Sequence, residues 1–123
     1  MDIHGYQQYK AQSISTMTSG ELLMLLYDEL IKRLTRAELA LQKQDFDLFE
    51  ASIQRSIDIL QYLDDTLDPQ YPISHDLHRL YDFFLYELGR VHIGRNAKVL
   101  AEVKPRLTEL RDTFREAQKA GGV

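Results

Sequence analysis

Apolar residues recur every three or four positions through four successive segments of this 123-residue chain. That spacing places side chains on one face of an α-helix, whereas a half-buried strand would need strict alternation. The segments span roughly residues 18–43, 45–67, 74–94 and 96–118. Short connections favour antiparallel neighbours. The pattern therefore predicts an all-α protein, an antiparallel up-down-up-down four-helix bundle with an N-terminal arm or short cap.

Capping residues and prolines predict the helix boundaries. Thr18 and Glu21 have the spacing of a capping box, so the first helix should begin there. Asp45 is a suitable N-cap for the second helix and Ser74 for the third. The segment 68–72 holds two prolines, which cannot continue a helix, and it should end the second one.

The chain divides into one folded unit and two flexible ends. Residues 1–17 are polar and rich in Gln and Ser, and they predict an N-terminal arm. Residues 18–118 form the bundle, and residues 119–123 should fray. Pro105 lies inside the last helix and removes one amide donor, so we expect a kink near it or a break into two pieces.

Composition narrows the functional classes. A net charge of −4 argues against nucleic-acid binding, which needs a basic surface. The absence of cysteine excludes disulfides and thiolate metal sites. The start of the chain lacks the pattern of a secretion signal, and no apolar run approaches the ~18 residues of a membrane span. We expect a cytoplasmic protein without membrane insertion.

The helices carry more apolar surface than one core requires. Residues 22–27 are apolar all round, so the first turns of the first helix need cover on more than one side. On helical wheels, Leu48, Ile59 and Tyr62 fall opposite the main stripe of the second helix. On the third helix, Phe83 and Tyr86 do the same, whereas the fourth helix has little such surface. Single exposed hydrophobics are ordinary, but a contiguous set indicates a groove for a partner.

Apolar residues in the arm suggest an occupant of this surface in the free protein. They are Tyr6, Tyr9, Ile14 and Met17. The arm could cover part of the groove until a partner displaces it. The alternative is a flexible terminus without function.

Few residues offer catalytic or metal-binding chemistry. His75 and His78 have a spacing that could share a metal, but no Glu-x-x-His motif accompanies them, and we interpret them as a polar first turn. Asp64 and Asp65 lack a companion histidine in sequence and should lie in solvent. His92 sits near a helix end, where a phosphorelay histidine is not expected. We therefore predict no enzyme activity, no cofactor and no metal.

Several blocks resemble, in order, the FliS family of export chaperones for flagellin. The matching residues are Tyr6-Gln7-Gln8 with Tyr9, Thr18-Ser19-Gly20-Glu21-Leu22, Met24-Leu25-Leu26-Tyr27-Asp28, Leu80-Tyr81-Asp82-Phe83, Leu100-Ala101-Glu102-Val103 and Leu110-Arg111-Asp112-Thr113-Phe114. The chain departs from the family at Ser19, where proline is common, and at Pro105.

The resemblance implies a cytoplasmic bundle that binds the disordered C-terminal segment of flagellin, prevents premature polymerisation and aids delivery to the flagellar export gate. By match to family blocks, the resemblance implies roles for Tyr6, Tyr9, Leu22, Leu25, Tyr27, Tyr81 and Phe83, with a structural role as the alternative for Tyr81. Leu48, Ile59, Tyr62 and Tyr86 rest on the helical-face argument alone. The alternative function is a structural bundle that self-associates, as a homodimer, through the same surface.

Overall fold

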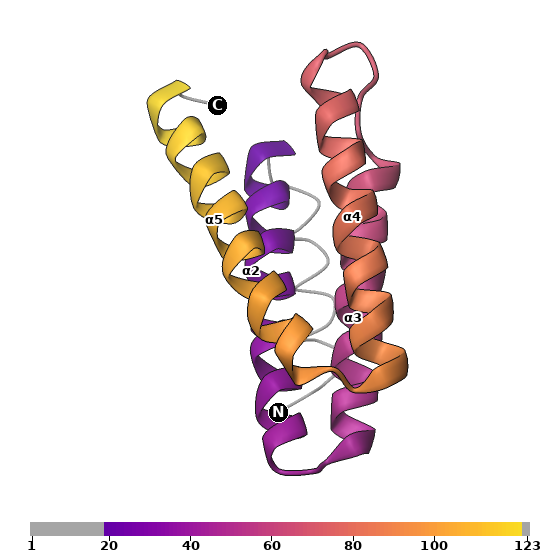
Figure 1. Ribbon diagram of the computed structural model, residues 1–123. Coiled ribbons are helices and arrows are strands. Elements are labelled where there is room, and N and C mark those ends of the chain that lie inside the picture. Colours follow the sequence, from indigo (N-terminus) through magenta and orange to yellow (C-terminus); the bar gives the residue numbers. More distant parts are fainter. Residues whose placement is uncertain (1–18, 122–123) are drawn as a thin grey trace, which may run out of the picture.

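Four helices make up the computed structural model, which describes residues 19–121 (Figure 1). They are α2 (Ser19–Gln42), α3 (Phe46–Asp65), α4 (Ile73–Gly94) and α5 (Ala97–Gly121). The predicted all-α bundle is confirmed. The predictions for the arm, namely Tyr6, Tyr9, Ile14 and Met17, and for a capping box at Thr18 lie outside the described residues.

The helices pack in a ring around one core. Helix α2 lies against α3 and α5, and α4 lies against the same two helices, which is the neighbour pattern of an up-down-up-down bundle (Figure 1). The largest fully buried side chains come from every helix: Tyr27, Leu30, Leu34, Phe49, Ile53, Leu60, Tyr81, Phe84, Leu88, Val91, Leu100 and Leu107. A single core of this size agrees with one domain.

Two helix starts follow the sequence and one differs. The Asp45 carboxylate accepts from the Leu48 amide, and the Asn96 side chain accepts from the Val99 amide, so both act as N-caps. The prediction that Ser74 caps the third helix is wrong. The carbonyls of Tyr71 and Pro72 receive the first amides instead, the helix begins at Ile73, and Ser74 is buried in the bundle.

The turn between α4 and α5 is held by one arginine. Arg95 adopts a left-handed conformation with φ of 48°, and its amide bonds to the Val91 carbonyl to close α4. Its guanidinium lies 3.8 Å from the centroid of the Phe46 ring, at the start of α3. This contact fixes the α4–α5 turn against α3.

Helix α5 continues through Pro105 without a break, so the predicted division into two pieces does not occur. Pro105 deprives the Ala101 carbonyl of its helical amide partner. Both residues are exposed, so water can satisfy that carbonyl. The helix ends at Gly121, beyond the expected 118, and the Gln118 side chain donates to the Gly20 carbonyl at 2.9 Å.

Candidate polypeptide-binding site

A groove runs between the first turns of α2 and the last turns of α3. It encloses a hollow of about 370 Å³. Its lining combines apolar side chains with two residues of opposite charge, and the residues are Leu22, Leu25, Leu26, Arg55, Asp58, Ile59 and Tyr62. Four of these residues were predicted as partner contacts from the sequence: Leu22, Leu25, Ile59 and Tyr62. The fold brings these four together.

The groove has an apolar floor and a partly exposed wall. Ile59 is only 7% exposed, so it forms the floor, whereas Tyr62 is 49% exposed one turn later on α3. Leu22 and Leu25 are half-buried on α2. Arg55 and Asp58 add charges of both signs at the edge. Such a surface suits an amphipathic chain that places apolar side chains inward and polar ones outward.

Ile59 packs in the core of the bundle, whereas the helical wheel predicted it on the outer face of the second helix. The buried face of α3 includes Ser52 and Ser56, and the Ser56 hydroxyl donates to the Ser52 carbonyl at 2.9 Å. Because these small polar residues are not apolar, the stripe predicted from apolar residues alone, which ran through Phe49, Ile53, Ile57 and Leu60, was centred too far toward Ile57. The true face is rotated toward Ile59 and Leu63.

Tyr27 and Tyr81 are core residues, so neither is available to a partner in this structure. Their hydroxyls share a hydrogen bond across the bundle, between α2 and α4, and Phe114 of α5 stacks on the Tyr27 ring at 5.6 Å between centroids. Burial raises the pKa of the Tyr27 hydroxyl far above its ordinary value, and Tyr81 reinforces the shift. Burial also raises the pKa of Tyr81. Burial therefore favours the alternative considered for Tyr81, a structural role, and it favours the same role for Tyr27.

The remaining predicted contacts are exposed but lie away from the groove. Leu48 is on the first turn of α3, and the Phe83 ring lies 5.2 Å from the Arg106 guanidinium of α5. Tyr86 borders a second hollow, of about 490 Å³, on the outer side of α4. That hollow is lined by Leu85, Tyr86, Gly89, Arg90, Ile93, Gly94 and Asn96.

Ile93 is the residue of this second patch that the sequence analysis missed. It is 90% exposed, the highest value among the large exposed hydrophobics. Its signal was present in the sequence, because Ile93 follows Tyr86 by seven positions and therefore shares its helical face. Gly89 lies between them and has open space where a side chain would project. On this face of α4, two large exposed side chains, Tyr86 and Ile93, therefore flank a glycine that has no side chain.

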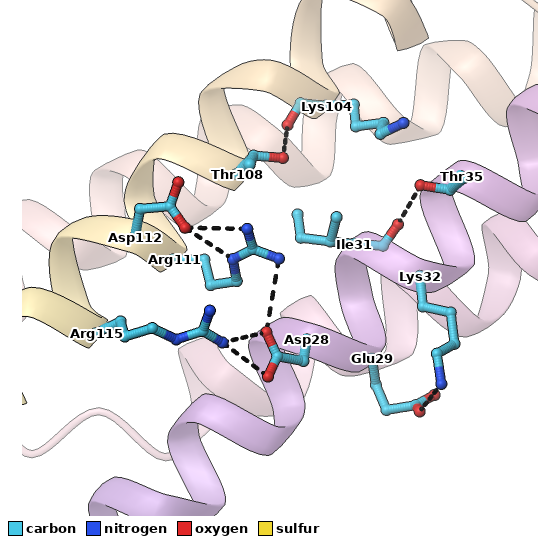
Figure 2. Close-up of polar contacts among 10 residues, drawn as sticks. All are labelled: Asp28, Glu29, Ile31, Lys32, Thr35, Lys104, Thr108, Arg111, Asp112 and Arg115. Carbon is cyan, nitrogen blue, oxygen red and sulfur yellow. Dashed lines mark hydrogen bonds and ion pairs between the residues drawn. The ribbon is translucent and has the colours of Figure 1, made fainter.

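The seam between α2 and α5 is polar. The Asp28 carboxylate of α2 accepts from Arg115 at 2.7 and 2.9 Å and pairs with Arg111 at 3.6 Å (Figure 2). Lys104 of α5 donates to Glu38 of α2 at 2.7 Å. Among the described residues, none of the large exposed hydrophobics belongs to α5. Within residues 19–121, the large exposed hydrophobics therefore lie on α2, α3 and α4 and in the connection between α3 and α4.

Two histidines link α3 to α4 through carboxylates, which corrects one prediction. Asp64 does not lie in solvent, because only 9% of its side chain is exposed, and its carboxylate is 2.6 Å from Nδ1 of His78. This hydrogen bond, with the negative charges of Asp64 and Asp82, raises the pKa of His78. Asp65 is exposed, as predicted. At the other end of the contact between α3 and α4, His92 of α4 forms a hydrogen bond with Glu50 of α3.

No helix within residues 19–121 is long and apolar enough to cross a membrane. The fold and the groove together define a class of protein: a four-helix bundle with an open apolar groove between two of its helices.

Comparison with known proteins identifies the family. The model of the flagellar protein FliS family matches residues 2–121, and the chain belongs to this family. FliS is a family of chaperones and not of enzymes, so the predicted absence of enzyme activity is confirmed.

One curated relative and one solved structure agree with this assignment. The flagellar secretion chaperone FliS of Bacillus subtilis (strain 168) is 29% identical over 112 residues, covering 91% of this chain and 84% of the relative. A crystal structure of a bacterial flagellar chaperone has a TM-score of 0.77 at 20% identity, covering 98% of this chain and 99% of the other. The structural match supports the fold.

Proposed function

We propose that this protein is a cytoplasmic export chaperone that binds the disordered C-terminal segment of flagellin. The α2–α3 groove, with Leu22, Leu25, Ile59 and Tyr62, is the central contact. Bound client cannot join a filament prematurely, and the complex delivers it to the flagellar export apparatus. The observation that carries the proposal is the apolar lining of this groove on a member of a chaperone family.

The chemistry of the groove suits a segment that folds on binding. A disordered segment loses conformational entropy when it orders, so it needs a continuous apolar surface to compensate. The groove offers partly exposed leucines on α2 and Tyr62 on α3, beside the charged side chains of Arg55 and Asp58. Leu48, Phe83 and Tyr86 extend the exposed apolar surface along α3 and α4, so a long client segment has several places to bind.

We also propose that the N-terminal arm covers part of this surface in the free protein. The proposal rests on the apolar character of Tyr6, Tyr9, Ile14 and Met17 in the sequence. A cover that competes with the client lowers the apparent affinity by the fraction of protein that is covered. Deleting residues 1–12 should therefore strengthen binding of the client. Unchanged affinity would refute the competition.

The test is calorimetric titration of the full-length protein with a peptide of the flagellin C-terminal segment. We expect saturable binding with one peptide per chaperone chain. A large negative heat-capacity change should accompany it, because apolar surface is buried. A peptide from the flagellin N-terminal end serves as a control. Absence of binding, together with a stable homodimer in analytical ultracentrifugation, would replace the chaperone proposal with the self-associating bundle.

A further inference from the structure

Three metal-ligating side chains meet where the end of α3 lies beside the start of α4. They are Asp64 of α3 and the pair His78 and Asp82, one turn apart on α4. One ligand atom from each lies within 4.8 Å of the other two. The imidazole Nδ1 is 2.6 Å from Asp64 Oδ1, and Nε2 is 3.4 Å from Asp82 Oδ2. The cluster lies on the side of α3 that faces α4, away from the α2–α3 groove.

The charge of this cluster is unbalanced. With a neutral imidazole, Asp64 and Asp82 together carry two negative charges, and even a protonated His78 leaves one uncompensated. The negative charge of Asp64 is the costlier of the two, because only 9% of its side chain is exposed. A nearly buried carboxylate needs a cation or strong hydrogen-bond donors beside it. A divalent cation bound to a neutral imidazole and both carboxylates brings the net charge to zero.

The space beside the cluster admits an ion with water. A hollow of about 210 Å³ is lined by both Asp64 and His78, and its other walls are Leu67, Pro69, Ser74 and His75. A water molecule occupies about 30 Å³ of liquid, so this hollow, which Asp82 does not line, has room for several waters on the Asp64–His78 side of the cluster. His75 contributes a second imidazole to the same wall.

We propose that Asp64, His78 and Asp82 form a binding site for a divalent first-row transition metal of borderline softness, such as Zn²⁺. The ion replaces the proton between Nδ1 of His78 and the Asp64 carboxylate; the exposed Asp82 side chain, which lies against Nε2, turns to supply the third ligand, and water completes a tetrahedral set. The imidazole favours Zn²⁺, Co²⁺ or Ni²⁺ over Mg²⁺ and Ca²⁺, which prefer oxygen ligands. Because the ligands come from two helices, the ion ties the end of α3 to the first turns of α4.

The test is titration of the tag-free, EDTA-treated, full-length protein with ZnCl₂ in a calorimeter, alongside MgCl₂. We expect one saturable Zn²⁺ site per chain and no saturable Mg²⁺ binding. His78→Gln and Asp82→Asn should each lower the Zn²⁺ affinity by about tenfold or more, because each removes a ligand. His92→Gln is the matched control, since His92 pairs with a single carboxylate, and its affinity should equal that of the unaltered chain.

A second measurement separates loss of the site from loss of the fold. Zn²⁺ should raise the melting temperature of the unaltered protein, because an ion that binds the folded state stabilises it, and at the same Zn²⁺ concentration this rise should be smaller in Asp82→Asn. The Asp82 side chain is 60% exposed, so the melting temperature of this variant without metal should match that of the unaltered chain. Zn²⁺ binding that is absent, or that persists undiminished in both His78→Gln and Asp82→Asn, would overturn the proposal.

Discussion

Replacing Tyr62 by serine tests the α2–α3 groove most directly. Tyr62 is 49% exposed in the free protein. A tyrosine buries up to ~200 Å² when fully covered, so a client that covers the exposed half removes about 100 Å² from water. At about 25 cal/mol per Å², this burial contributes roughly 2.5 kcal/mol to binding. Since every 1.4 kcal/mol is a factor of ten, Tyr62→Ser should weaken binding by at most about 60-fold.

The matched control is Tyr71→Ser. Tyr71 is 61% exposed, in the connection between α3 and α4, and it does not line the groove. Both variants lose the same side chain from a largely solvated position, so both should melt close to the unaltered protein. Calorimetric titration with the flagellin C-terminal peptide then compares three dissociation constants. We expect the value for Tyr62→Ser to rise at least tenfold and the value for Tyr71→Ser to stay unchanged.

Three outcomes would refute this reasoning. Equal affinities for Tyr62→Ser and the unaltered protein would show that the client does not cover this wall of the groove. Equal losses in Tyr62→Ser and Tyr71→Ser would show that the effect does not depend on position. A fall in melting temperature confined to Tyr62→Ser would place its ring in the core, contrary to its exposure.

Three further predictions concern stability. Ile59→Ala should lower the free energy of unfolding by about 2–4 kcal/mol in urea denaturation, because Ile59 is buried; a loss confined to client binding would contradict this. Tyr27 and Tyr81 have raised pKa values, so their contribution to stability is present below the unfolded tyrosine pKa of about 10 and is lost as pH rises above it. The ultraviolet tyrosinate signal of both should therefore appear only with alkaline unfolding, and early titration of the intact protein would contradict their burial. Asp28→Asn should cost no more than about 1 kcal/mol, because the ion pairs are partly exposed, and the cost should shrink in high salt; salt-independent loss would argue against an electrostatic origin.

Periodicity and capping residues were sufficient to predict the helices and their order. The cap at Asp45 was predictable because a short polar side chain directly before an apolar stripe commonly caps a helix. Ser74 also precedes an apolar stripe, but it does not cap the third helix. The turn ending at Pro72 supplies carbonyls that start the helix earlier, and no single-residue signal reports that geometry.

The site was less predictable because it depends on where the core lies between helices. Ser52 and Ser56 are buried on α3, and counting only apolar residues therefore misplaced Ile59. Tyr27 and Tyr81 match family blocks, yet a sequence match does not separate a core residue from a surface one. Asp64 and His78 are fourteen positions apart, and their contact depends on the register of α3 against α4, which periodicity alone does not give.

The placement of polar and apolar contacts suits a bundle that must expose apolar surface and stay folded. Arg115 and Lys104 tie α5 to α2 through carboxylates at the surface of the bundle, where an ion pair adds little net stability but specifies which helices are neighbours. The described residues that line the α2–α3 groove form no ion pair between α2 and α3; its two charged residues, Arg55 and Asp58, both belong to α3. A client that enters there gains apolar contact without breaking an ion pair of the α2–α5 seam. Client binding and the α2–α5 ion pairs therefore depend on different surfaces, and replacing Asp28 should leave client affinity unchanged, whereas replacing the buried groove residue Ile59 affects stability.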